Sequence, residues 1–334
     1  MPNPKLSQKN LLIAFDAFGT LFTPRGPIGA LYGEIARKHG ICGDVSDEDI
    51  MSSFKKAFKH NAKERPNYGK EVGMDPTAWW SNIITQTFTP FLSTQKSSSP
   101  GSAPPNPPSL PHRLVPDLIT RFASRDGYTL YNDVIPLFAS LRAARGGSGS
   151  SRRKIVTAVL TNSDDRVAGI LRSFGLRVGH VDPETVEKIA ASTYPNGSGS
   201  TSATTLLQPE RLGENDIDFV LTSYDCGYEK PHRAIFDAAR RLALARYAQV
   251  GEGEETGREI DDDGEWEAVY VGDEVDKDVV GAEEAGWANA FLVDREGLVR
   301  DARDVVRRED VGGEGQQQVR VLRDLRELET YVLG

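Results

Sequence analysis

The chain has 334 residues, enough for two domains at roughly 100 to 200 residues each. Its 38% apolar and 8% aromatic residues exclude a wholly disordered protein, despite 32 Gly and 19 Pro. Most of the net charge of −9 comes from residues 251–267, where nine acids and one Arg give −8 and leave about −1 for the rest. The acidity therefore belongs to one local segment, and no basic patch with interleaved aromatics predicts a nucleic-acid partner.

Several absent signals indicate where the protein resides. No apolar run approaches the eighteen or so residues of a membrane-spanning helix, and residues 11–15 are too short a run for a signal-peptide core. The two cysteines, Cys42 and Cys226, provide no disulfide framework, which favours a reducing compartment. We expect an intracellular protein of the cytoplasm or nucleus that is not secreted and binds no membrane. The sequence identifies no protein partner.

The first apolar run, residues 11–15, predicts a buried strand, and a helical region without strand-like runs follows it. Ser46 or Asp47 is suited to begin the second of its helices. Residues 93–112 contain six Pro and six Ser and predict a flexible linker. The three expected helices are residues 27–38, 47–63 and 77–88.

After this region, strand-length apolar runs alternate with helix-period segments, which is typical of a parallel sheet covered on both faces. Asp164 or Asp165 is suited to cap a helix that continues to Phe174. Leu322, Leu325, Leu328 and Val332 indicate a C-terminal helix packed on the core. The expected strands are residues 11–15, 155–160, 219–222, 268–271 and 290–293.

The predicted organisation is a discontinuous α/β core interrupted by an inserted helical domain, which is called the cap below. The core comprises residues 1–22 and 128–334, and the cap comprises residues 23–127, including the Pro/Ser-rich insert 93–112.

Polar residues follow four of the five expected strands, at the ends where open parallel sheets bind ligands. Each alone has an ordinary explanation as a turn residue, a strand-end hydroxyl or a surface lysine. Their occurrence in chain order at the same end of four strands favours one shared site. They are Asp16 in LLIAFDAFGTLF, Thr161 and Asn162 in AVLTNSDD, Lys230 in FVLTSYDCGYEKP, and Asp273 and Asp278 in VYVGDEVDKD.

These segments resemble the four motifs of the haloacid dehalogenase-like (HAD) hydrolase superfamily. The resemblance covers residues 10–25 and 128–295, and the helical insertion stands where that superfamily places its first type of cap. The stretches DFVLTS, GYEKPHRAIFDAA and VGDEVDKDVVGAEEAG are similar to eukaryotic HAD-like hydrolase domain-containing proteins. The resemblance implies an α/β fold, with a Rossmann-like parallel sheet flanked by helices and an inserted α-helical cap domain.

The resemblance also implies a hydrolase that attacks a small phosphorylated molecule through Asp16. An aspartate that attacks a phosphoryl group approaches an anion as an anion, so cations must offset the repulsion. Lys230 can supply a fixed positive charge, and Mg²⁺ favours carboxylate and phosphate oxygens. The implied Mg²⁺ ligands are Asp16, Asp273 and the main-chain carbonyl of Phe18.

The remaining roles follow from the same resemblance. Asp278 is expected to orient Lys230 or a metal-bound water. The implied catalytic residues are Asp16, Thr161 and Lys230, and the implied phosphate-binding residues are Gly19, Thr20, Thr161, Asn162 and Lys230.

Phe18 departs from the phosphatase pattern, in which a second Asp two residues after the nucleophile is the general acid and base. Loss of such a group typically costs 10²- to 10⁴-fold in rate. The sequence therefore leaves three hypotheses open: a Mg²⁺-dependent phosphatase or phosphotransferase with weakened acid/base catalysis, a catalytically silent binding protein, and a 2-haloacid dehalogenase-like hydrolase. Asp273 and Asp278 argue against the last, because that type of enzyme works without metal. His232 is expected to begin a helix, with the missing acid as its alternative role.

Overall fold

The computed structural model describes residues 9–92, 109–145, 153–193, 214–248, 266–298 and 319–333. Most of the predicted linker, residues 93–108, and the acidic segment up to residue 265 lie outside them. The chain divides into a sheet unit, Met1–Thr23, Leu130–Ser163 and Gly175–Gly334, and a helical unit, Pro24–Thr129 and Asp164–Phe174.

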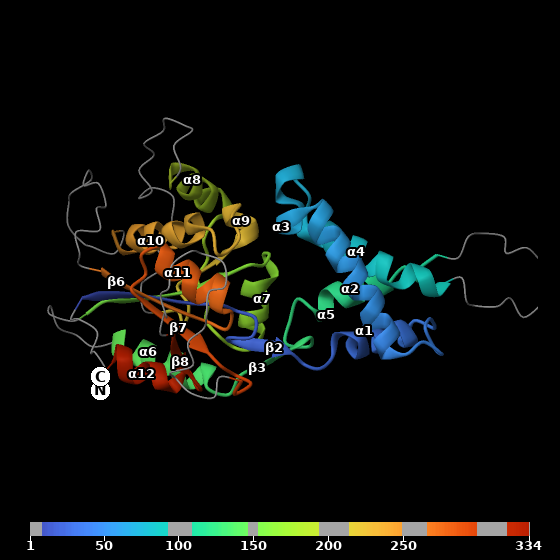
Figure 1. Cartoon of the computed structure of the whole chain (residues 1–334), viewed down its shortest axis with the longest axis horizontal. Helices are drawn as coiled ribbons and strands as arrows, with labels where there is room; N and C mark the ends of the chain where they lie inside the picture. Colours follow the sequence, from blue (N-terminus) through green and yellow to red (C-terminus); the bar gives the residue numbers. More distant parts are fainter. Residues whose placement is uncertain are drawn as a thin grey trace, which may run out of the picture. The chain divides into compact units, whose positions relative to one another are not determined.

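The sheet unit is built on six parallel strands in the order β5-β4-β1-β6-β7-β8 (Figure 1). The chain runs from β1 outward through β4 to β5 and then returns to the other side of β1 at β6. The connections therefore reverse beside β1, where open α/β sheets bind their ligands. The strands are β1 (Asn10–Phe15), β4 (Ile155–Thr161), β5 (Phe219–Thr222), β6 (Trp266–Gly272), β7 (Asn289–Val293) and β8 (Arg320–Leu322).

Both faces of this sheet are apolar because helices cover both. Leu12 and Ala14 of β1 belong to one buried cluster with α8 and α10, whereas Phe15 packs edge-on against Phe138 of α6 at 5.3 Å. Successive side chains of a strand alternate between faces, so a strand buried on both sides is continuously apolar. The predicted α/β core with a Rossmann-like sheet is thus confirmed.

The helices of the sheet unit differ in which face they cover. Figure 1 shows α8, α9 and α10 on one side of the sheet and α6 and α12 on the other. Their bounds, with two helical turns after β6, are α6 (Val134–Arg145), α8 (Pro183–Thr193), α9 (Ser223–Cys226), α10 (Arg233–Ala248), η3 (Val275–Val280), α11 (Gly281–Glu284) and α12 (Arg326–Val332).

The helical unit is connected to the sheet unit through a two-stranded sheet of β2 (Phe22–Pro24) and β3 (Tyr128–Leu130). Ser46 caps α2 by accepting the Asp49 backbone N–H at 3.1 Å, as one sequence prediction proposed. Among the described residues, no helix combines the length and apolar character needed to cross a membrane. The helices of this unit are α1 (Ile28–Lys38), α2 (Asp47–Glu64), α3 (Pro66–Gly69), η1 (Lys70–Val72), α4 (Pro76–Leu92), α5 (Leu114–Arg121) and α7 (Arg166–Ser173).

Residues 164–174 were assigned to the core from sequence, but they cluster with the helical unit. The buried Asp164 carboxylate accepts the indole N–H of Trp80 at 2.8 Å and forms two 2.8 Å bonds with Arg166. The Arg166 guanidinium lies 4.7 Å from the centre of the Trp80 ring. These contacts explain why α7 packs with α4.

The C-terminal prediction was partly wrong. Leu322 belongs to the edge strand β8, Leu325 is the N-cap of helix α12, and only Leu328 and Val332 lie within that helix. All four apolar positions are nevertheless buried, so the segment does pack on the sheet unit. The spacing of these four residues is typical of one helix, but it arises from a strand end and a short helix that both direct apolar side chains toward the same core.

Candidate active site

Asp16 lies directly after β1, between the ends of β4 and β6. Its backbone N–H donates to the Val271 carbonyl at 2.8 Å, which continues the β1–β6 ladder past the last strand residue. The side chain is only 7% exposed. Burial raises the pKa of the Asp16 carboxyl above its ordinary value, against the opposing influence of Lys230. The site thus holds a carboxylate that is poorly hydrated.

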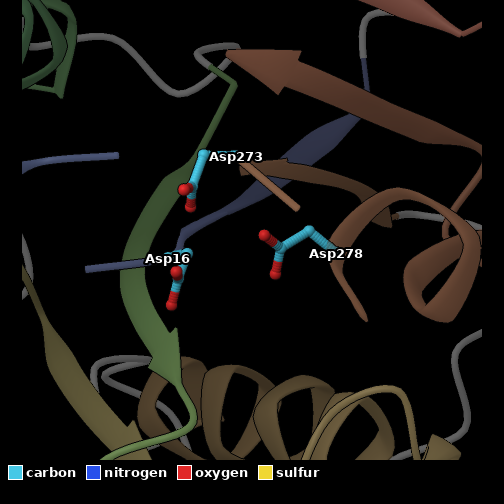
Figure 2. A group of neighbouring side chains, drawn as sticks. All are labelled: Asp16, Asp273 and Asp278. Atoms are coloured by element: carbon cyan, nitrogen blue, oxygen red, sulfur yellow. The ribbon is translucent and has the colours of Figure 1, made fainter. Parts of the chain in front are cut away.

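Asp273 and Asp278 complete a group of three carboxylates (Figure 2). Each offers one oxygen, and the oxygens of Asp16, Asp273 and Asp278 lie within 4.8 Å of one another. Burial, followed by repulsion from the other two carboxylates, raises the pKa of Asp273 to about 7. At such distances, two charges repel by about 3 to 4 kcal/mol at an effective dielectric constant of 20. The group therefore needs positive charge.

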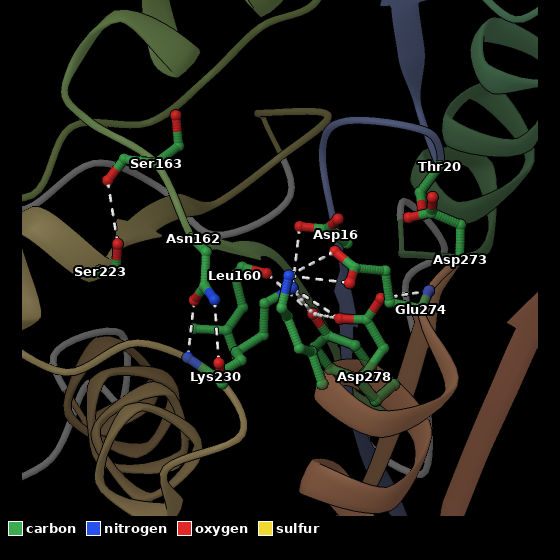
Figure 3. A network of polar contacts seen from close by, with 12 residues as sticks. Asp16, Thr20, Leu160, Asn162, Ser163, Ser223, Lys230, Asp273, Glu274 and Asp278 are labelled. Carbon is green, nitrogen blue, oxygen red and sulfur yellow. Dashed lines mark hydrogen bonds and ion pairs between the residues drawn. The ribbon is translucent and has the colours of Figure 1, made fainter. Parts of the chain in front are cut away.

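Lys230 supplies part of that charge, with its ammonium surrounded by oxygens (Figure 3). The Nζ atom lies 2.6 Å from Asp278 Oδ1, 2.9 Å from Asp16 Oδ1 and 2.8 Å from the Tyr270 hydroxyl. Burial disfavours its charge, but the two carboxylates outweigh burial and raise the pKa of Lys230. Three carboxylates and one ammonium, when all are ionised, still leave the cluster at −2.

The last residue of β4, Thr161, and the residue after it, Asn162, support this cluster. The Thr161 hydroxyl acts to lower the pKa of the Asp16 carboxyl and so favours its ionised form. The Asn162 side chain forms a reciprocal pair with the Lys230 backbone, accepting its N–H at 2.6 Å and donating to its carbonyl at 2.9 Å. Asn162, which the resemblance assigned to phosphate, thus fixes the backbone of Lys230.

Two glycines leave the space that two of the carboxylates occupy. A Cβ on Gly19 would lie 2.1 Å from Asp273 Oδ2, and a Cβ on Gly272 would lie 2.2 Å from the Asp278 side chain. Gly19 also has a φ of +75°, a conformation that residues with a side chain rarely adopt. The neighbouring Thr20 hydroxyl donates to Asp273 Oδ1 at 3.3 Å. The turn after β1 is therefore pressed against the carboxylate that follows β6.

Arg295, which gives no motif signal in the sequence, fixes the same turn from the segment after β7. Its guanidinium donates to the Thr20 carbonyl and to the Asp133 carboxylate, and it lies 4.1 Å from the centre of the Tyr131 ring. Asp133 also accepts the Leu325 backbone N–H at 2.7 Å. A lone arginine after a strand gives no sequence signal of this role.

Phe18 is half-buried in this turn, and its ring packs edge-on against Phe22 at 4.8 Å. The position that would carry an acid in a phosphatase thus carries a ring in an apolar contact. His232 acts as a helix-start residue, because its Nδ1 accepts the Ala234 backbone N–H at 3.1 Å at the beginning of α10.

The donor set fits a divalent cation. Asp16 Oδ1 is buried, and among the described residues its close polar contact is the ion pair with Lys230 at 2.9 Å. This oxygen retains its capacity to bind a further cation. Asp16, Asp273 and the Phe18 carbonyl are hard oxygen donors of the type Mg²⁺ prefers. When all four groups are ionised, the cluster charge of −2 favours binding of such an ion.

Comparison with known proteins agrees with this geometry. Residues 227–328 match the family model described as HAD-hydrolase-like. The chain is 25% identical to the uncharacterized hydrolase C7D4.05 of Schizosaccharomyces pombe over 280 residues, covering 84% of this chain and 89% of that one. It is 26% identical to haloacid dehalogenase-like hydrolase domain-containing protein 3 of Bos taurus, covering 84% and 81%.

A solved structure shows the same fold. The magnesium-bound HAD hydrolase YfnB of Bacillus subtilis superposes with a TM-score of 0.51 over 98% of this chain and all of that one, at 12% identity. The family model, the relatives and the sheet with its four motif-bearing strand ends lead to one conclusion. They support the haloacid dehalogenase-like hydrolase superfamily as the family of this chain.

Proposed function

We propose that the protein is a Mg²⁺-dependent phosphatase or phosphotransferase that acts on a small phosphorylated molecule through Asp16. The carrying observation is the cluster of three carboxylates within 4.8 Å, two of which contact one buried ammonium. A cluster left at −2 is suited to hold a divalent cation and, with it, an anionic substrate.

In this proposal an Asp16 oxygen attacks phosphorus while the bond from phosphorus to the leaving oxygen breaks, forming an aspartyl phosphate. Lys230 offsets charge beside the nucleophile, and Thr161 with the backbone N–H of Thr20 binds phosphoryl oxygens. The Gly19 N–H, which the resemblance also assigned to phosphate, donates instead to the Phe22 carbonyl at 2.9 Å. Mg²⁺, held by Asp16, Asp273 and the Phe18 carbonyl, would supply positive charge to the phosphoryl group. Water, or an acceptor hydroxyl, then attacks phosphorus while the bond from phosphorus to the Asp16 oxygen breaks. This step regenerates the Asp16 carboxylate, releases phosphate or the phosphorylated acceptor, and passes the proton of the attacking group to solvent.

Phe18 determines which leaving groups this chemistry serves. Without a carboxylic acid at that position, the leaving oxygen departs as an anion. Carboxylates and other weakly basic groups leave in this way, whereas sugar alkoxides need a proton. We therefore infer that acyl phosphates and similarly activated phosphates are better substrates than ordinary sugar phosphates.

A panel of phosphorylated metabolites, including acetyl phosphate, tests the proposal with and without Mg²⁺. We expect turnover with Mg²⁺ and none after EDTA treatment, together with a higher melting temperature in Mg²⁺. Asp273→Asn should weaken Mg²⁺ binding about tenfold or more, because it removes a charged ligand. Asp276→Asn is the matched control, since Asp276 is an exposed carboxylate three residues further along. Equal turnover with Mg²⁺ and with EDTA would contradict the metal dependence.

The contact between Phe18 and Phe22 also favours a second candidate, a catalytically silent binding protein of the HAD fold. Phe18→Asp separates the two. If only the acid is missing, this variant should hydrolyse a phenyl or sugar phosphate at least about tenfold faster than the wild type. Phe22→Leu controls for loss of the ring contact. Fast wild-type hydrolysis across the panel would exclude the silent candidate.

The dehalogenase alternative is weaker on electrostatic grounds. A 2-haloacid is itself a carboxylate, and three clustered carboxylates repel it unless a cation is bound. Chloride release from 2-chloropropionate that persists in EDTA would favour this alternative over the phosphatase.

A further inference from the structure

The Tyr270 hydroxyl is buried beneath the active-site lysine, at a position that resembles ordinary core in the sequence. Tyr270 lies on β6, opposite Ala14 of β1, and is 0% exposed. Phe236 and Trp287 pack edge-on against its ring, at 5.4 Å and 5.9 Å. A ring packed in this way has little freedom, so its hydroxyl occupies a fixed place.

The hydrogen-bond partners of this hydroxyl determine its direction. The Lys230 ammonium has only donors, so the phenol oxygen must accept from it at 2.8 Å. The single phenol proton then goes to an acceptor, and the Leu160 carbonyl at 2.8 Å is nearer than Asp278 Oδ1 at 3.2 Å. The hydroxyl therefore presents a lone pair to the lysine and its proton to β4.

Lys230 is thereby fixed at both ends. Asn162 holds its backbone through two hydrogen bonds, and Tyr270 holds its ammonium on the side away from solvent. A lysine side chain has a flexible four-carbon stem and a rotating head, so its charge is directed only by what surrounds it. With Tyr270 as one acceptor and Asp278 as another, the ammonium remains 2.9 Å from Asp16.

We propose that Tyr270 is a positioning residue that aims the Lys230 ammonium at the nucleophile. The same hydroxyl fixes the end of β4, because Leu160 directly precedes Thr161. Its effect on turnover rests on the proposed function, whereas its effect on the lysine does not. The Tyr270 hydroxyl thus connects β6 to two of the four motif-bearing segments, the one that contains Lys230 and the end of β4.

Tyr270→Phe removes one oxygen and keeps the packed ring. We expect kcat for acetyl phosphate with Mg²⁺ to fall about tenfold or more, with KM changed less than threefold, because the lysine is misdirected in the transition state. In a Lys230→Met background, Tyr270→Phe should cause no further loss, since the hydroxyl acts through the lysine. The control is Tyr331→Phe, which removes the hydroxyl of a tyrosine on α12 whose ring packs against Phe291. This variant should leave kcat unchanged.

A second readout is independent of turnover. The buried Lys230 ammonium should give a slowly exchanging ¹H–¹⁵N lysine signal, assigned by its loss in Lys230→Met. Tyr270→Phe should shift this signal or speed its exchange with water, and Tyr331→Phe should not. An unchanged signal, or an equal loss of kcat with and without Lys230, would overturn the proposal. A shifted signal in a protein whose wild type turns over no phosphate would sustain the positioning role and reject the proposed function.

Discussion

Asp16→Asn is expected to abolish turnover while leaving the protein at least as stable as the wild type. Removal of a nucleophile costs on the order of 10⁴-fold or more, because the remaining groups cannot form the covalent intermediate. The stability follows from electrostatics. Burial raises the pKa of Asp16, so the folded state disfavours its charge, and an amide of the same shape removes that charge. Turnover of acetyl phosphate and the melting temperature measure the two effects.

Asp216→Asn provides the matched control with the opposite expected pattern. Asp216 is a buried carboxylate that pairs with Arg142 and accepts the Arg177 backbone N–H at 2.8 Å. It precedes β5, at the end of the sheet opposite the site. Its amide variant should lower the melting temperature and retain activity. If Asp16→Asn kept activity within tenfold of the wild type, Asp16 would not be the nucleophile.

Lys230→Met should destabilise the protein by about 3 to 5 kcal/mol in the absence of divalent ions. The Lys230 side chain is 2% exposed, and its removal changes the ionised cluster from −2 to −3 while leaving Asp278 without its closest cation. Turnover should also fall about a hundredfold or more but stay measurable, because one of the cations that stabilise the transition state is removed. Urea unfolding with and without Mg²⁺ measures the change, and Mg²⁺ should restore more stability to the variant than it adds to the wild type.

The control for this substitution is Lys277→Met. Lys277 pairs with Glu274 on the same stretch of chain, but its side chain is 44% exposed, and such pairs contribute about 0 to 1 kcal/mol. Equal unfolding free energies for the Lys230 and Lys277 variants without Mg²⁺ would contradict the account of the charged cluster.

The sheet was largely predictable because its strands are buried on both faces and are continuously apolar in sequence. The same property placed the candidate residues, since parallel strands bring their carboxyl ends to one edge. The short strand β8 was not predictable, because three residues with one buried leucine give no periodicity. Helix α7 was predicted, but its packing against the helical unit was not. That packing depends on the hydrogen bond between Asp164 and Trp80, which are far apart in the sequence.

The supporting residues were harder to find than the motif residues. Tyr270 lies within an apolar strand, where an aromatic residue usually indicates core packing, and its hydroxyl is informative only once Lys230 is seen beside it. From the sequence alone, the Asn162 amide could bind either a ligand or a backbone. In the structure it forms two hydrogen bonds with the backbone of Lys230. Residue type alone does not say which partner a polar side chain has.

The Asp273 and Asp278 side chains occupy their places only because Gly19 and Gly272 have no side chains. Gly40, Gly175 and Gly286 have similarly positive φ but open space where a side chain would begin, so asparagine is tolerable there. At Gly19 and Gly272 even alanine would displace an acid from its place. In a library of all single substitutions, Gly40, Gly175 and Gly286 should therefore be replaceable, whereas Gly19 and Gly272 should accept no other residue.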